Sequence, residues 1–295
     1  MLKMYHTRPH SGSSPDFWEE NWAASHFEES VRFCAVDPLR PLFEKYLRPD
    51  SLMLEGGCGM GNYITYYAAR GFKVIGVDFA QKALKTLHQR QPDLMLAAGD
   101  VARLPFDDEV FDVYYSGGVV EHFEGGAEAA LKEARRVLKR DGALLISVPY
   151  FNPLRRILAP FRKQEWRVVD RTEVGEDGVT GKNFFQYAYK AGEFESMLSA
   201  AGLTTVDRQP YAILWGLGEI PLFRIDEGEF PPLSSDRPAE DVKAVDAGEL
   251  IKERKGSVLK RLAVNEDAGI PVLGLGVRVL RWSAANMMMY VCKRA

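Results

Sequence analysis

The chain has 295 residues, of which 46% are hydrophobic and 27% charged, with a formal net charge of −3. This composition is that of an ordinary globular protein, and the length suits one large domain with insertions or a domain with a cap. A slightly acidic chain without a block of lysine or arginine disfavours a nucleic-acid partner. The 3 cysteines are widely separated, which excludes a disulfide framework and indicates a reducing compartment, the cytoplasm.

A helix is predicted near the N-terminus. Ser14 can cap it and Pro15 suits its first turn. Trp18, Trp22 and His26 follow at spacings of four residues, so they are expected to share one face of this helix. Core packing is the simplest interpretation of that face, and a lid over a ligand is the alternative.

Residues 52–62, Leu-Met-Leu-Glu-Gly-Gly-Cys-Gly-Met-Gly-Asn, are the most informative stretch of the chain. They read as an apolar strand that ends at Glu55 and turns through glycines into a helix. Because glycine has no side chain, such a turn lets the backbone come close to a ligand. A second strand at 73–78 also ends on an acid, Asp78. Strand, glycine turn, helix, strand and acid together outline a unit that binds an adenosine-containing cofactor.

Two classes of adenosine-containing cofactor, a dinucleotide and S-adenosylmethionine, are compatible with the outline of this unit. The dinucleotide fingerprint G-x-G-x-x-G, counted from Gly57, requires a third glycine where this chain has Asn62. A carboxylate at Glu55 would also repel a pyrophosphate. It suits a cofactor that carries an ammonium group and no phosphate, such as S-adenosylmethionine. A nicotinamide-dependent oxidoreductase is therefore the less favoured alternative.

The alternation of strands and helices from 52 to 148 predicts a parallel sheet covered on both faces. Residues 151–183 break this alternation, and residues 172–183 among them are polar and glycine-rich, which predicts a loop. A strand is expected at 203–214. A last strand is expected at 287–293, whose three methionines would fill the sheet.

Two later segments have unusual composition. Residues 222–255 are acidic and rich in proline and serine, which predicts an excursion from the fold. Residues 269–282 are the most apolar long segment, although Arg278 and Arg281 interrupt them. Core packing is the simpler interpretation of this segment, and contact with a membrane surface is the alternative. We expect no transmembrane segment, since no window of about 18 apolar residues exists.

Several motifs, in order, resemble those of the class I S-adenosylmethionine-dependent methyltransferases. They are the glycine loop at 55–61, Gly-Val-Asp at 76–78, Gly-Asp-Val at 99–101, the approach to the fourth strand at 104–113 and the helix end at 131–142. The resemblance implies an α/β fold: a doubly wound, mostly parallel seven-stranded sheet of the Rossmann-like methyltransferase type. The last strand would be antiparallel, and helical and loop insertions would form a cap.

The resemblance also implies roles for individual residues. Asp78 would accept hydrogen bonds from the ribose hydroxyls, while Asp100 and the backbone of Val101 would meet the adenine amino group. Glu55 and the glycine loop would hold the methionine portion of the cofactor. Acids at strand ends often only cap the next helix, which is the alternative for each one taken singly. The cofactor-binding residues expected in this way are Glu55, Gly56, Gly57, Cys58, Gly59, Gly61, Asp78, Phe79, Asp100, Val101 and Gly117.

The candidate catalytic residue is His122, which directly follows the fourth strand. Ligands of an open parallel sheet bind at the carboxyl ends of its strands, so a base is well placed there. Positioning of the substrate or packing at a helix start is the alternative. Side chains that are expected to meet the substrate, or else to anchor the cap, are Trp18, Trp22, His26, Tyr150 and Tyr187. No metal-ligand signature is visible.

These motifs predict a methyltransferase that converts S-adenosylmethionine to S-adenosylhomocysteine. The acceptor is expected to be a small, partly apolar or aromatic metabolite, methylated at oxygen, nitrogen or carbon. Residues 116–119, Ser-Gly-Gly-Val, depart from the Asn/Asp-Pro-Pro-Tyr/Phe motif of nucleic-acid amine methylation. The expected organisation is a helical lid at 1–30 and a methyltransferase domain at 31–295, with cap insertions at about 151–183 and 215–285. A non-catalytic protein that retains the cofactor site is a further alternative.

Overall fold

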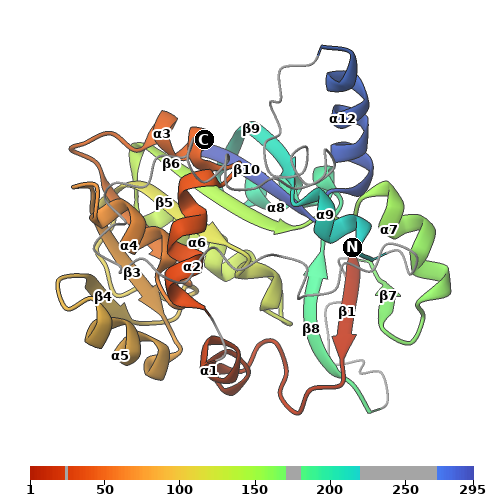
Figure 1. The fold of residues 1–295 in the computed structure, drawn as a ribbon, viewed down its shortest axis with the longest axis horizontal. Helices are drawn as coiled ribbons and strands as arrows, with labels where there is room; N and C mark the ends of the chain where they lie inside the picture. The colour runs from red at the N-terminus through yellow and green to blue at the C-terminus, as the bar shows by residue number, and fades with distance from the viewer. Residues whose placement is uncertain (24–25, 171–180, 220–270) are drawn as a thin grey trace.

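The computed structural model describes residues 1–23, 26–170, 181–219 and 271–295. These residues form a seven-stranded sheet flanked by helices, with a separate three-stranded sheet beside it (Figure 1). The strand order of the large sheet is β4-β3-β2-β5-β6-β10-β9. The predicted loop at 172–183 lies largely outside the described residues, and the predicted excursion at 222–255 lies wholly outside them.

The large sheet confirms the expected α/β fold. Strands β2 to β6 pair in parallel, whereas β10 lies antiparallel between β6 and β9. The predicted antiparallel last strand is therefore correct. The strands are β2 (Leu52–Gly56), β3 (Lys73–Asp78), β4 (Met95–Ala98), β5 (Phe111–Gly117), β6 (Leu138–Pro149), β9 (Leu203–Tyr211) and β10 (Met287–Arg294).

Helices connect these strands and cover the sheet. The connecting helices are α3 (Arg40–Tyr46), α4 (Asn62–Ala68), α5 (Gln81–Arg90), η2 (Val120–His122), α6 (Glu128–Val137) and α8 (Ala191–Ala200). In α6, Leu131, Ala134 and Val137 recur at helical spacing and are all buried. Arg135 and Arg136 occupy its last turn, where the helix dipole favours cations. An apolar stripe of this kind fixes α6 against the sheet.

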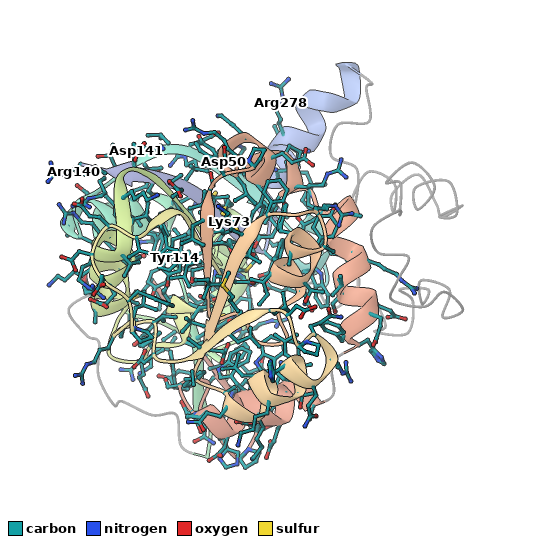
Figure 2. All side chains as sticks on the ribbon, turned by 90° about the vertical axis from the view of Figure 1, so that its left-hand side faces the viewer. Asp50, Lys73, Tyr114, Arg140, Asp141 and Arg278 are labelled. Atoms are coloured by element: carbon teal, nitrogen blue, oxygen red, sulfur yellow. The ribbon has the colours of Figure 1, made fainter. Side chains whose placement is uncertain are left out.

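The core forms two layers, one on each face of the sheet. One layer contains Leu131 of α6 and the other contains Ile64 of α4 and Leu87 of α5. Side chains of β10 alternate between these layers, with Met288 in the first and Met289 in the second. Both methionines are fully buried, so they fill the sheet as the sequence predicted. Figure 2 shows Tyr114 of β5 within this packed body.

The small sheet consists of β1 (Leu2–His6), β7 (Trp166–Val168) and β8 (Asn183–Ala188). Strand β1 lies in the middle and pairs antiparallel with both neighbours. The sequence predicts no strand in the first 30 residues, so β1 is a feature that the predicted helical lid at 1–30 does not include. The helix predicted to begin near Ser14 is present as α1 (Pro15–Ala23).

The expectation that His26 shares a face with the two tryptophans is also wrong. Helix α1 ends at Ala23, and His26 is the N-cap residue of the next helix, α2 (Phe27–Phe33). A change of helix between these residues breaks the spacing on which the prediction rested. His26 is exposed to solvent.

Four elements gather at one end of the molecule, beyond β6. They are α7 (Pro153–Leu158), η3 (Ala159–Phe161), α9 (Ile213–Leu217) and α12 (Pro271–Ala284). Helix α12 contacts α7 and α9, and it projects from the body of the protein (Figure 1). Within the described part of the chain, no helix combines the length and the apolar composition needed to cross a membrane.

Candidate active site

The glycine loop between β2 and α4 has a conformation that other residues rarely adopt. Gly57, Gly59 and Gly61 have φ angles of +77°, +52° and +70°. The N–H groups of Gly57 and Cys58 both donate to the carbonyl oxygen of Val77, at 2.8 and 3.0 Å. A Cβ atom on Gly57 would lie 2.4 Å from a methyl group of Val119. Glycine is therefore required here, because the loop runs directly past the end of β5.

Asp78 at the end of β3 joins this loop to the following helix. Its Oδ2 accepts a hydrogen bond from the N–H of Gly59 at 2.7 Å, and its Oδ1 accepts one from Ala80 at 2.8 Å. Burial raises the pKa of Asp78, and these backbone donors oppose that rise. Each carboxylate oxygen can accept a second hydrogen bond. Asp78 can thus fix the loop and still bind a hydroxyl group.

Glu55 lies behind the loop. It is buried, and its Oε2 accepts a hydrogen bond from the N–H of Ile64 at 3.2 Å. Burial, with a smaller contribution from the nearby Asp78, raises the pKa of Glu55 to about 8. The expected contact of Glu55 with the cofactor stays a prediction.

A cavity of about 330 Å³ opens at the carboxyl ends of β2, β3 and β5. This volume is in the range of small-molecule sites. Two carboxylates, Asp78 and Asp100, line it, and no lysine or arginine among the described residues does. Such a lining suits a cofactor with ammonium and sulfonium groups better than a pyrophosphate, which arginine and lysine usually bind. The lining is made by Gly12, Ser13, Pro15, Trp18, Trp22, Gly57, Asp78, Phe79, Gly99, Asp100, Val101, Gly117, Gly118, Val119, His122 and Phe123.

Helix α1 covers the cavity with two tryptophans. Trp18 and Trp22 stack with ring centroids 5.5 Å apart, and the Trp18 Nε1–H donates to the carbonyl of Gly12 at 2.8 Å. A Cβ atom on Gly59 would lie 2.5 Å from the Trp22 ring, so this ring rests directly on the glycine loop. The Ser13 hydroxyl donates to the carbonyl of His122 at 2.6 Å and ties the N-terminal segment to the end of β5.

His122 lies on η2 and also lines the cavity. Its Nδ1 is 2.7 Å from the carbonyl oxygen of Phe185. Because a carbonyl only accepts, Nδ1 carries the hydrogen and Nε2 keeps a lone pair. Burial lowers the pKa of His122 to about 4, so the imidazole is neutral near pH 7. The edge of the Trp18 ring contacts it, with centroids 4.7 Å apart.

Glu121 is the second unusual titratable group at this point. It is buried, and its Oε1 lies 3.9 Å from Nε2 of His122. Burial raises the pKa of Glu121 to about 8, so this carboxyl group holds its proton near neutral pH. Neither Glu121 nor His122 therefore carries a charge under these conditions.

The cavity brings together residues that lie far apart in the sequence. Most of the predicted cofactor residues line it, and so do the predicted Trp18, Trp22 and His122. The predicted residues in the lining are Trp18, Trp22, Gly57, Asp78, Phe79, Asp100, Val101, Gly117 and His122. The glycine loop also contains predicted residues that do not line the cavity, namely Gly56, Cys58, Gly59 and Gly61. Burial raises the pKa of the Cys58 thiol, so this thiol is not a ready nucleophile.

Three predicted substrate residues, Tyr150, Tyr187 and the exposed His26, do not line the cavity. Tyr187 is fully buried in the small sheet, and its hydroxyl donates to the carbonyl of Glu124 at 2.9 Å. Tyr150 is buried at the end of β6, outside the cavity lining. Conversely, Gly12 and Ser13 line the cavity without having been predicted. The only sign of them was the small, polar run Ser-Gly-Ser-Ser-Pro at 11–15, which is typical of a turn before a helix.

Comparison with known proteins assigns a domain type to the part of the chain that carries this site. Residues 54–146, which carry the glycine loop, Asp78 and Asp100, match the family model described as a methyltransferase domain. This part of the chain is a methyltransferase domain, and it is similar to S-adenosylmethionine-dependent methyltransferases. The cofactor of this domain is accordingly S-adenosylmethionine, which fits a cavity lined by the Asp78 and Asp100 carboxylates and by glycine backbone. Within the described residues, no cluster of His, Cys, Asp and Glu could hold a metal ion.

Three curated relatives illustrate the similarity. A probable S-adenosylmethionine-dependent methyltransferase of Mycolicibacterium smegmatis is 33% identical over 128 residues, which cover 42% of this chain and 49% of the relative. A malonyl-[acyl-carrier protein] O-methyltransferase of Salmonella typhimurium is 30% identical over 150 residues, covering 50% and 57%. A demethylmenaquinone methyltransferase of Renibacterium salmoninarum is 35% identical over 117 residues, covering 38% and 48%. The chain thus spans about half the length of these relatives.

Proposed function

We propose that this methyltransferase transfers the methyl group of S-adenosylmethionine to a small, partly apolar or aromatic metabolite. The observation that carries the proposal is the composition of one cavity. Asp78 and Asp100 line it together with two stacked tryptophans and a neutral histidine. Aromatic side chains of this kind favour a flat or apolar acceptor.

The names of the relatives support the identity of the methyl donor more than that of the methyl acceptor. One relative is named for methylating malonyl-[acyl-carrier protein] and another for methylating demethylmenaquinone. These acceptors differ in chemistry, although the matched domain is shared. The proposed acceptor class therefore rests on the lining that α1 adds to the domain, which comes from Trp18 and Trp22.

The proposed roles follow from the positions of the side chains. S-adenosylmethionine, when bound, supplies the methyl group and the driving force of the transfer. Asp78 would bind the ribose hydroxyls with its free lone pairs, and the loop at Gly57 would allow close backbone approach. Trp18 and Trp22 would hold the acceptor and exclude water. Alignment of two reactants can lower the barrier by roughly 7–11 kcal/mol, which is more than a general base contributes.

His122 is proposed as the base for acceptors that must lose a proton. The hydrogen bond from Nδ1 to Phe185 fixes the ring and leaves the lone pair on Nε2. A neutral imidazole can accept a proton without first releasing one. A base of this kind adds about 10²–10⁴-fold to the rate, which is less than alignment contributes.

The test is calorimetric titration of the purified protein with S-adenosylhomocysteine, followed by transfer assays with labelled donor. We expect binding of the product and labelling of phenols, quinols or aromatic amines in a metabolite panel. Absence of binding at millimolar S-adenosylhomocysteine would refute the proposal. Binding without turnover on any acceptor would favour the non-catalytic alternative, and quenching of tryptophan fluorescence by NADH alone would favour the oxidoreductase.

A further inference from the structure

The exposed apolar side chains of the protein concentrate at one end. Of the 11 large hydrophobic residues that are exposed in the described part of the chain, more than half lie on α7, η3, β7 and α12. Phe161 is 83% exposed and Ile157 is 65% exposed, which is unusual for side chains of this size. We call this surface the α7–α12 face; its apolar residues are Ile157, Phe161, Val168, Val279, Leu280 and Trp282.

The elements that carry the α7–α12 face contact one another. Helix α12 packs against α7, and β7 packs against η3. In Figure 1 these elements lie together at one side of the molecule, and Figure 2 shows Arg278 of α12 standing out beyond the body. A contiguous exposed apolar surface on a folded protein marks an interaction site rather than a chance exposure.

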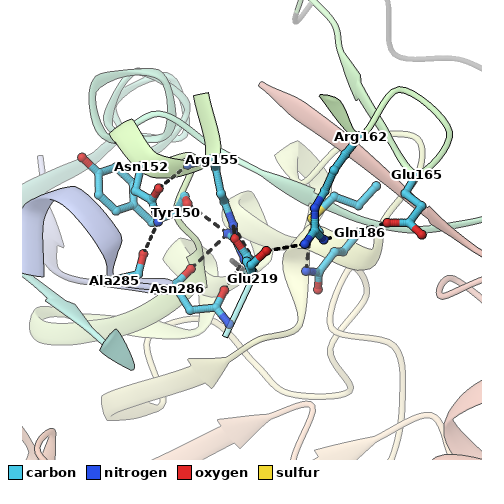
Figure 3. Close-up of polar contacts among 10 residues, drawn as sticks. Tyr150, Asn152, Arg155, Arg162, Glu165, Gln186, Glu219, Ala285 and Asn286 are labelled. Atoms are coloured by element: carbon cyan, nitrogen blue, oxygen red, sulfur yellow. Dashed lines mark hydrogen bonds and ion pairs between the residues drawn. The ribbon is translucent and has the colours of Figure 1, made fainter. Parts of the chain in front are cut away.

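A buried arginine holds this face in place from the inside. Arg155 of α7 is 1% exposed, and its guanidinium binds the Glu219 carboxylate, with Nη2 2.6 Å from Oε1 (Figure 3). It also donates to the carbonyls of Tyr150 and Asn286, at 2.9 and 3.1 Å. Glu219 follows α9, Tyr150 directly follows β6, and Asn286 directly precedes β10. The network therefore ties α7 to the segments that carry α9 and α12, and the face is preorganised.

The charges on the α7–α12 face are predominantly positive. Helices α7 and α12 contain no acidic residue, and the stretch 162–168 contains a single one, Glu165. Arg156 and Lys163 are exposed and lie next to Ile157 and close to Phe161 in the sequence. The whole chain, in contrast, has a net charge of −3. Basic residues are thus gathered around apolar ones on a protein that is otherwise acidic.

We propose that the α7–α12 face docks on an anionic lipid bilayer surface. Exposed aromatic and aliphatic side chains would enter the headgroup boundary, and the surrounding arginines and lysine would bind lipid phosphates. A second protein molecule as the occupant would be expected to match this face with acidic groups, whereas an anionic membrane supplies that charge over the whole surface. This inference goes beyond the proposed function, because it concerns where the enzyme works and not what it methylates.

The test is flotation of the full chain with lipid vesicles. Vesicles of equal parts phosphatidylglycerol and phosphatidylcholine should carry the protein, whereas pure phosphatidylcholine should not. Binding should weaken as salt is raised to about 0.5 M, because the charge contribution is screened. The double variant Ile157→Ser/Phe161→Ser should lose roughly tenfold or more in partitioning. Arg156→Gln/Lys163→Gln should lose roughly fivefold per charge.

Matched controls alter similar residues elsewhere. Met95→Ser/Val206→Ser removes two apolar side chains that are 50% and 52% exposed on β4 and β9, and it should float like the parent. Lys85→Gln/Lys132→Gln removes two exposed lysines and should do the same. All variants should bind S-adenosylhomocysteine equally, which separates this proposal from the proposed function.

Three results would overturn the proposal. The first is absence of the parent protein from the anionic vesicles. The second is equal loss in the control variants and the face variants. The third is self-association in solution that Ile157→Ser/Phe161→Ser abolishes while vesicle binding stays absent, which would make the face an interface between copies of the chain.

Discussion

Replacing Asp78 by asparagine tests the proposed cofactor site most directly. The carboxylate accepts backbone hydrogen bonds from Gly59 at 2.7 Å and Ala80 at 2.8 Å, one on each oxygen. An asparagine keeps one acceptor oxygen and turns an N–H₂ group toward the other donor, so one buried backbone N–H loses its partner. That loss costs about 1–3 kcal/mol of stability. The hydroxyl groups of the cofactor would also lose a charged acceptor, which is worth about 1.5–3 kcal/mol.

The expected result of Asp78→Asn is therefore a rise in Kd for S-adenosylhomocysteine of roughly 10- to 150-fold, measured by calorimetry. The matched control is Asp37→Asn. Asp37 is also buried and accepts two hydrogen bonds, from the Leu39 N–H at 2.7 Å and the Tyr63 hydroxyl at 2.6 Å, but it lies outside the cavity lining. It should lose stability in a denaturant titration without losing affinity. An unchanged Kd for Asp78→Asn, or an equal loss of affinity for S-adenosylhomocysteine in Asp37→Asn, would refute the reasoning.

Three further changes test other parts of the site. His122→Asn should lower kcat about 10²–10⁴-fold while cofactor affinity stays constant, and an unchanged kcat would exclude the base. Gly57→Ala and Gly71→Ala both place a side chain at positive φ, +77° and +85°, but only the Gly57 Cβ meets a neighbour, at 2.4 Å. In denaturant titrations Gly57→Ala should therefore lose about 1–3 kcal/mol more than Gly71→Ala. The folded state holds the Glu121 proton up to about pH 8 while the unfolded chain releases it at its ordinary pKa of 4.5, so stability should fall as pH rises between these values. Glu121→Gln should flatten that decline in melting temperature, and an identical pH profile would contradict the assignment.

The parts of the site that sequence could predict are local. The glycine loop and Asp78 lie within one strand-turn-helix-strand unit, so spacing along the chain determines their arrangement. Asp100 and Gly117 follow because each parallel strand ends at the same edge of the sheet. Their positions in the cavity needed no knowledge of distant contacts.

The parts that sequence could not predict depend on long-range pairing. Strand β1 is only 5 residues long and gains its partners from residues more than 150 positions away. Short strands owe their structure to such neighbours and not to their own propensity. Tyr187 is an aromatic residue of the kind that often contacts substrates. Because its strand pairs with β1, however, its side chain is buried in the core. Ser13 reaches His122 for the same reason, since β1 carries the N-terminal segment across the molecule.

The position of β10 between β6 and β9 bears on how the protein is made. During translation β9 leaves the ribosome before β10 does, yet β10 is the only described strand that pairs with it in the large sheet. The slot beside β6 must stay open until these 8 residues emerge, with the apolar flank of the sheet uncovered meanwhile. Completion of the sheet is thus a late event, and a nascent chain that stalls before Met287 would present two unsatisfied strand edges to chaperones and proteases.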